Sequence, residues 1–202
     1  MKRQILEAPG LPTRSAAPAG LQFIVPSVTK LVDAVREASD NRNSVTHGEA
    51  HWKCVAWSGL DLAHATPGAD PAVVFLFALL HDSQRHPDAE PADHGRRAVE
   101  LADRLSEAGL IRLDAVARGR LDEALLTHHA GALSDCPTVG ACFDADRLQL
   151  WRLGFAPPAD DMSTRAGRCP KRIAKGKCQL GRHKDWLSIF TGFEMLKMMQ
   201  AG

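Results

Sequence analysis

The 202-residue chain contains no tyrosine, carries a net charge of only +1, and has no apolar stretch that reaches about 18 residues. We therefore expect no transmembrane helix. The small net charge gives no general reason to expect a nucleic acid or a membrane as a partner. The first 26 residues lack the continuous apolar region of a secretory signal.

Cysteines are few and unevenly spaced. There are five of them, an odd number, so they do not form a disulfide framework, and a reducing cytoplasm is the predicted compartment. Hydrophobic residues make up 45% and charged residues 24% of the chain, which is ordinary for a globular protein with one sizeable core. Nine histidines beside the missing tyrosines are the unusual feature of the composition.

The sequence shows neither an internal repeat nor a long alternation of apolar and polar residues, so no strand is predicted. Apolar residues instead recur at helical spacing between capping residues, glycines and prolines. The predicted fold class is all-α, a bundle of about six to eight helices. We expect three segments: a poorly ordered leader over 1–26, a helical domain over 27–157, and a basic segment with a C-terminal docking helix over 158–202.

The most informative stretch is an apolar run that ends in two potential metal ligands. Asp70 and Pro71 are typical of a helix start, and the next nine residues, 72–80, carry no charge. His81 and Asp82 follow at the buried end of the predicted helix, where an imidazole and a carboxylate are costly without compensation. A bound cation compensates both. The alternative is a carboxylate that only orients the neighbouring histidine.

Other predicted helices also direct His or Asp toward the core. The residues concerned are His51, His94, the pair His128 and His129, and Asp146. Several imidazoles packed together without a metal would lose solvation or repel one another when protonated. We therefore predict one or two divalent transition-metal ions, with Mn, Fe, Co, Ni and Zn all open. A structural zinc site is disfavoured, because such sites usually hold cysteine in a short loop.

The order of these motifs resembles the H…HD…D signature of the HD superfamily of metal-dependent phosphohydrolases. The resemblance covers about 44–154 and includes further motifs of one bacterial branch. They are the HGxxH opening at His47–His51, the HD pair at His81 and Asp82, the HG pair at His94 and Gly95, and the closing DADRL at 144–148.

The resemblance implies a helical HD-type domain that hydrolyses a phosphate ester or nucleotide with a metal-activated water. The implied ligands of the first metal are His51, His81, Asp82 and Asp146; those of a second are His94 and His128, with Asp82 bridging. Asp82 and Arg85 would be the catalytic residues, and Arg85 would contact phosphate. His47 and His129 would support the ligands or contact the substrate.

The sequence departs from the pattern of this bacterial branch at two places, and the second of them bears on the substrate. Gln149 stands where the closing motif usually continues with a second acid. The residues after His129 do not match the loop of the cyclic-dinucleotide phosphodiesterases, which disfavours that substrate. Two alternatives stay open: a di-iron oxygenase similar to myo-inositol oxygenase, and a regulatory module that binds a nucleotide without turnover.

The C-terminal segment differs in composition. Eight Lys or Arg residues and no acid lie between Met162 and Lys184. A solvated basic segment is favoured there over nucleic-acid contact. Cys169 and Cys178 lie too far apart for a short zinc loop with His183, so we expect the segment to be dispensable for metal binding.

Overall fold

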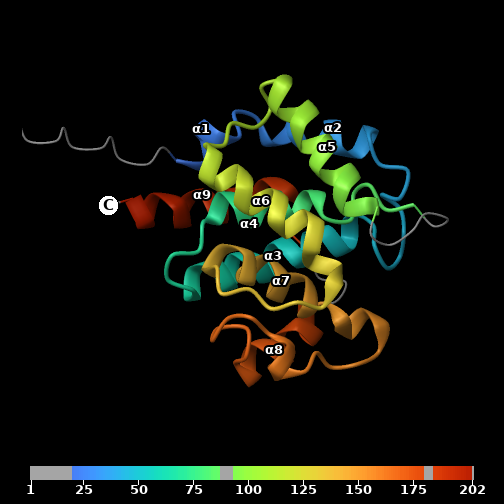
Figure 1. Ribbon diagram of the computed structural model, residues 1–202, viewed down its shortest axis with the longest axis vertical. Coiled ribbons are helices and arrows are strands. Elements are labelled where there is room, and N and C mark those ends of the chain that lie inside the picture. Colours follow the sequence, from blue (N-terminus) through green and yellow to red (C-terminus); the bar gives the residue numbers. More distant parts are fainter. Residues whose placement is uncertain (1–19, 87–92, 180–183, 202) are drawn as a thin grey trace, which may run out of the picture.

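The computed structural model describes residues 20–86, 93–179 and 184–201. These ranges contain nine α-helices, three short 3₁₀-helices and no strand, which confirms the all-α prediction (Figure 1). In chain order the elements are α1 Leu21–Ile24, α2 Val28–Glu37, α3 Glu49–Ala65, α4 Pro71–Leu80, α5 Asp93–Glu107, α6 Ala115–Thr127, η1 His128–Ala130, α7 Pro137–Arg147, η2 Leu150–Leu153, η3 Ala159–Asp161, α8 Pro170–Gln179 and α9 Trp186–Ala201.

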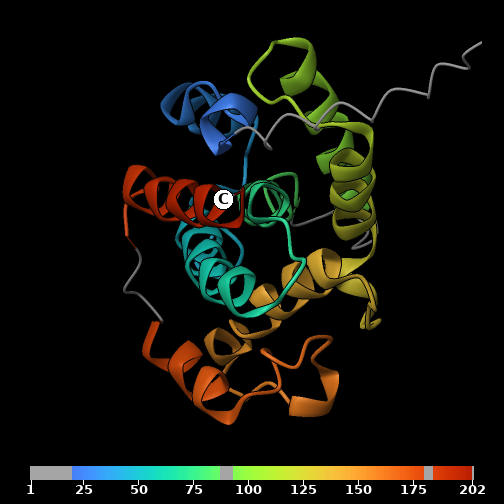
Figure 2. The same cartoon turned by 90° about the vertical axis from the view of Figure 1, so that its left-hand side faces the viewer.

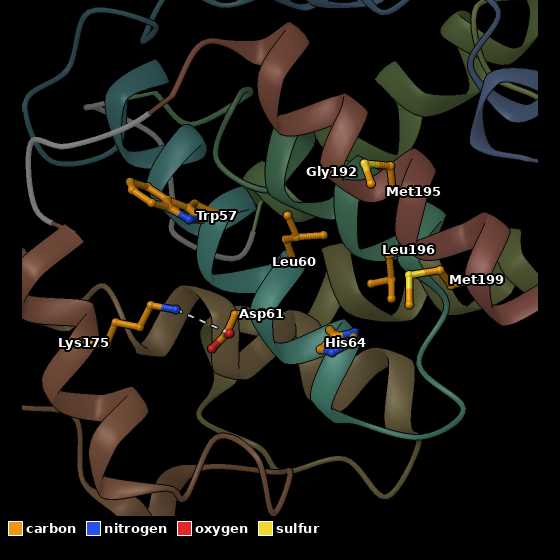
Figure 3. A pocket seen from close by; sticks show the side chains of 9 residues that line it. All are labelled: Trp57, Leu60, Asp61, His64, Lys175, Gly192, Met195, Leu196 and Met199. Carbon is orange, nitrogen blue, oxygen red and sulfur yellow. Dashed lines mark ion pairs between the residues drawn. The ribbon is translucent and has the colours of Figure 1, made fainter.

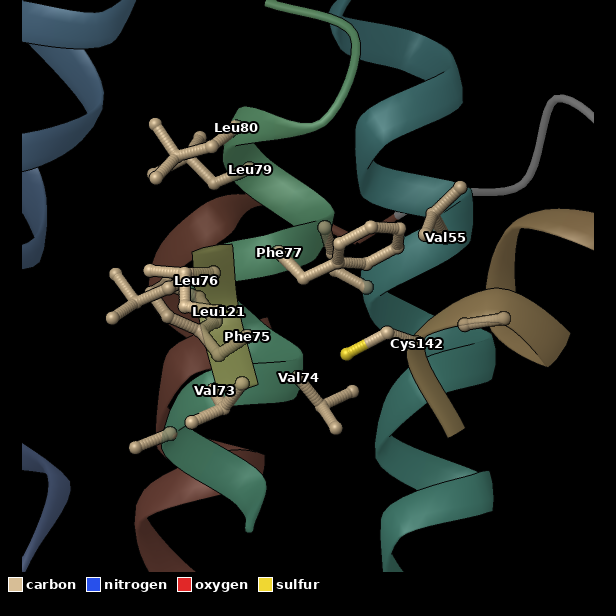
Figure 4. Close-up of a cluster of buried hydrophobic side chains, with 14 of the residues drawn as sticks. Val55, Val73, Val74, Phe75, Leu76, Phe77, Leu79, Leu80, Leu121 and Cys142 are labelled. Atoms are coloured by element: carbon tan, nitrogen blue, oxygen red, sulfur yellow. The ribbon is translucent and has the colours of Figure 1, made fainter. Parts of the chain in front are cut away.

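The apolar helix α4 is the centre of the bundle, and every one of its ten residues is buried. It packs against α3, α6, α7 and α9, which surround it in Figure 2. Side chains along α4 point in several directions, toward Val55 of α3, Leu121 of α6 and Cys142 of α7 (Figure 4). A helix that is apolar on all sides is stable only with neighbours on all sides, and this position supplies them.

Helix α9 belongs to the same core. The ring of Phe75 in α4 makes edge-on contacts with Trp186, Phe190 and Phe193 of α9, at centroid distances of 6.1, 5.4 and 5.6 Å. Phe193 is fully buried. The predicted boundary at 157 therefore does not separate two cores, and the C-terminal helix completes the one that α4 organises.

The end of the predicted leader is ordered. Residues 1–19 lie outside the described part of the chain, but α1 follows them, and Leu21 and Val25 are fully buried. The assignment of 20–26 to a poorly ordered leader is therefore wrong. Helix α6 continues through Gly119, although glycine is unfavourable in a helix interior. Burial of the α6 residues Leu121 and Leu125 offsets the cost of one glycine, about 1 kcal/mol.

The basic segment contacts α3 and α7. Asp61 of α3 pairs with Arg172 (2.9 Å) and with Lys175 (3.4 Å) of α8. Asp144 of α7 accepts hydrogen bonds from the backbone N–H groups of Ser163 and Thr164, at 2.7 and 2.8 Å. Among the described residues no helix is long and apolar enough to span a bilayer.

Candidate metal centre

The end of α4 positions His81 and Asp82. At the start of the helix the Asp70 carboxylate accepts a hydrogen bond from Ala72 N (2.9 Å), and Pro71 occupies the first turn. His81 caps the other end and is 0% exposed, and Asp82 is 3% exposed. A buried imidazole and a buried carboxylate are costly without polar or charged partners. The side chains that contact His81 and Asp82 therefore indicate what the pair does.

His51 from α3 and Asp146 from α7 reach the same place, and we call the four residues the first cluster. His51 Nε2 lies 3.1 Å from His81 Nε2, 3.2 Å from Asp146 Oδ1 and 3.5 Å from Asp82 Oδ2. His81 Nε2 lies 3.5 Å from Asp82 Oδ2 and 3.8 Å from Asp146 Oδ1. Two residues far apart in the chain thus join the adjacent pair His81 and Asp82.

His94 from α5 and His128 at the end of α6 form a second cluster with the other oxygen of Asp82. Their Nε2 atoms are 3.0 Å apart and lie 3.7 and 4.0 Å from Asp82 Oδ1. His129 is exposed, but its ring centroid is 5.3 Å from that of His94, and it groups with His94 and His128. Asp82 therefore faces the first cluster with Oδ2 and the second with Oδ1.

The spacing of these atoms fits a divalent cation. Bonds of about 2.1 Å to nitrogen and oxygen, at right or tetrahedral angles, place two ligand atoms about 3.0–3.4 Å apart. The distances within the first cluster run from 3.1 to 3.8 Å. Both groups, His51–His81–Asp146 and His94–His128–His129, could hold a metal ion.

The proton positions also fit a cation. His81 Nδ1 lies 3.2 Å from Ala78 O, and His128 Nδ1 lies 2.9 Å from Leu125 O. Carbonyl oxygens only accept, so each Nδ1 donates, and in a neutral ring the Nε2 atom is then an unprotonated acceptor. In the first cluster, His81 Nε2 and two carboxylate oxygens thus surround His51 Nε2. One proton on His51 can satisfy only part of this set, whereas one cation satisfies all of it.

The pKa values of the clustered side chains also favour the forms that bind a metal ion. Burial lowers the pKa of His81 and of His128 to about 4, so both rings are neutral near pH 7. Burial alone would raise the pKa of Asp82 and of Asp146, but the neighbouring histidines outweigh it and lower both pKa values. Neutral imidazole and ionised carboxylate are the forms that bind a divalent ion.

Arg85 lies beside Asp82, at the oxygen that faces the second cluster, and His47 lies beside His51 of the first cluster. Arg85 Nη1 is 3.5 Å from Asp82 Oδ1, and its side chain is 31% exposed, so it faces both the site and solvent. His47 precedes α3; its ring centroid is 6.4 Å from that of His51, and its Nδ1 lies 2.9 Å from Thr46 Oγ1. Burial lowers the pKa of His47 to about 4. His47 is therefore near the cluster without being grouped with its ligands.

The glycines of the two HG pairs allow close backbone approach. A Cβ on Gly48 would lie 2.4 Å from Ser44 O, and a Cβ on Gly95 would lie 2.4 Å from Leu125 O. The second contact brings α5 against the end of α6, next to the carbonyl that binds His128 Nδ1. Gly95 thus lets His94 and His128 meet.

Three residues that lie near Asp146 in the chain were assigned no role from the sequence. Arg152 Nη1 lies 3.8 Å from Asp146 Oδ1. Asp144, the first acid of the DADRL motif, does not face the clusters and instead binds Ser163 and Thr164. Gln149 is fully buried and donates to Ser58 Oγ at 2.7 Å. Of the three, only the orientation of Asp144 was predictable from the sequence. An acid two residues before Asp146 lies on another face of the helix and therefore points away from the cluster.

A separate cavity of about 320 Å³ lies between α3, α8 and α9 (Figure 3). Its walls combine apolar side chains of α3 and α9 with His64 and the Asp61–Lys175 ion pair. None of the residues of the two clusters lines it, so it is no part of the candidate centre.

Comparisons with known proteins identify no relative: no family model, no curated protein and no solved structure matches the chain. The side chains of the two clusters are therefore the basis for a proposed function.

Proposed function

We propose that the protein is a metal-dependent phosphohydrolase that acts on a phosphate ester or a nucleotide. The observation that carries the proposal is the arrangement of the two clusters, which share the Asp82 carboxylate and have an arginine beside it. Membership of the HD superfamily is part of the proposal.

In this proposal the first cluster would hold one divalent ion, and His94 and His128 would hold a second. Asp82 has one oxygen facing each cluster and would contribute to both. A divalent ion at such a site would lower the pKa of a bound water toward about 7 and would attract phosphoryl oxygens.

The residues around the ligands fix their form and orientation. The bonds from His81 Nδ1 to Ala78 O and from His128 Nδ1 to Leu125 O turn each Nε2 toward its cluster. Arg85, partly open to solvent, would bind a phosphoryl oxygen through its guanidinium group and stabilise the charge that gathers there during hydrolysis.

The presence of arginine favours a phosphate substrate over the oxygenase alternative, and the complete ligand set favours an enzyme over a module without turnover. The experiment is to purify the protein without chelator and to determine its metals by mass spectrometry. Release of inorganic phosphate is then measured across nucleotides and sugar phosphates, beside dioxygen consumption.

Metal-dependent phosphate release that is lost in Asp82→Asn is the expected result. Dioxygen consumption without phosphate release would replace the proposal with an oxygenase. Tight nucleotide binding without any product would replace it with a regulatory module.

A further inference from the structure

Arg152 lies in η2, one turn beyond the end of α7, and its side chain is only 14% exposed. Its Nη1 is 3.8 Å from Asp146 Oδ1, which is longer than a hydrogen bond. Arg152 is thus placed beside the first cluster without directly bonding its carboxylate.

Two backbone contacts hold the guanidinium group. Arg152 Nε donates to Thr46 O at 2.7 Å, and Nη1 donates to Gln149 O at 3.1 Å. Thr46 belongs to the turn before α3, so the side chain is fixed from two directions. Within the described part of the chain Nη2 makes no hydrogen bond or ion pair. Its two N–H donors are therefore available to a ligand.

The charges near Arg152 call for an anion once a cation is bound. A single divalent ion would already balance the two carboxylates, Asp82 and Asp146, whose oxygens lie 3.5 and 3.2 Å from His51 Nε2, and an imidazole that binds a metal adds no charge. Arg85 and Arg152 would then add positive charge next to a cation, in surroundings that exclude much of the water. Like charges repel more strongly there than in solvent, and a bound phosphoryl group relieves the repulsion.

We infer that Arg152 is a substrate-binding residue, which donates from Nη2 to a phosphoryl oxygen on the Asp146 side of the first cluster. Arg85 holds the same group from the side of Asp82. Arginine suits this task because its planar group keeps its structural bonds to Thr46 O and Gln149 O while it presents a further pair of donors. The inference rests on the proposed function.

The test measures binding of inorganic phosphate to the Mn²⁺-loaded full chain by titration calorimetry, with metal content determined on the same samples. Arg152→Gln should bind phosphate about 10- to 100-fold more weakly than the natural protein, as expected for one hydrogen bond between charged groups. Its metal content should not change.

Arg118→Gln is the matched control. Arg118 is also half-buried, pairs with Asp103 and Asp122, and donates to Val99 O, but it lies on α6 away from Asp146. Its phosphate affinity should match that of the natural protein. Arg152→Lys serves if the glutamine variant does not fold, and we expect it to bind phosphate at least about fivefold more weakly, because lysine lacks the fork of donors.

Two results would overturn the inference while leaving the proposed function intact. One is unchanged phosphate affinity in the Arg152 variants. The other is loss of metal from them, which would make Arg152 a positioning residue for Asp146. If the natural metal-loaded protein itself bound no phosphate, the proposed function would fail, and the role of Arg152 with it.

Discussion

Replacing Asp82 by Asn tests the centre most directly, because this carboxylate is the one group common to both clusters. Its oxygens lie 3.5 Å from His51 and His81 on one side and 3.7 and 4.0 Å from His94 and His128 on the other. Asparagine keeps the shape but has no charge and only one acceptor oxygen. We therefore expect Asp82→Asn to lose most of the metal at both clusters.

The size of the effect follows from linkage between binding and folding. Metal at about 100 times its dissociation constant adds about 2.7 kcal/mol to the free energy of unfolding. In a domain of this size that raises the melting temperature by roughly 5–10 °C. The natural protein, stripped with chelator and then reloaded, should show this rise in differential scanning calorimetry, and Asp82→Asn should show almost none.

Asp144→Asn provides the control. Asp144 is also buried, but its carboxylate accepts bonds from Ser163 and Thr164 and belongs to neither cluster. In the metal-free state this variant should have a free energy of unfolding about 1–3 kcal/mol lower than that of the natural protein. Its melting temperature should still show the full rise when metal is added back. Full metal occupancy and an unchanged rise in Asp82→Asn would refute the shared-carboxylate arrangement.

Three further predictions address the histidines and their packing. His94→Ala and His128→Ala should each lower the bound metal by about one ion per chain in mass spectrometry, and unchanged stoichiometry in both would leave a single-metal site. Burial lowers the pKa of His81 and His128 to about 4, below the unfolded value near 6.5, so the unfolded chain takes up more protons. The stability of the chelator-treated protein should therefore fall by several kcal/mol as the pH drops from 6.5 toward 4 in urea titrations, and a flat profile would contradict their burial as neutral rings. Gly95→Ala places a methyl group against Leu125 O and should lower the free energy of unfolding by at least about 1 kcal/mol. It should also weaken metal binding at the second cluster more than at the first. An equal loss of metal at both clusters would indicate a general destabilisation instead.

Some features of the protein follow from the sequence because they depend on neighbours in the chain. Helix α4 is predictable since its capping Asp70, its Pro71 and its apolar residues lie within about three turns. The residue types of the clusters are also visible, because His and Asp at inward positions of apolar helices need a partner.

Other features depend on contacts between distant segments. The burial of α1, the continuation of α6 through Gly119 and the place of α9 in the core are each decided by side chains from other helices. Their stabilisation exceeds the weak local preferences that a sequence reveals.

The same division holds within the candidate centre. His51, His81, Asp82, His94, His128 and Asp146 are visible in the sequence as an ordered set, and the resemblance implied their roles as metal ligands. Only the tertiary structure places one oxygen of Asp82 toward each cluster, directs Asp144 away from them, and holds Arg152 next to Asp146. A side chain's direction at the end of a helix depends on what packs there, and that packing comes from residues that can be a hundred positions away, as Thr46 is from Arg152.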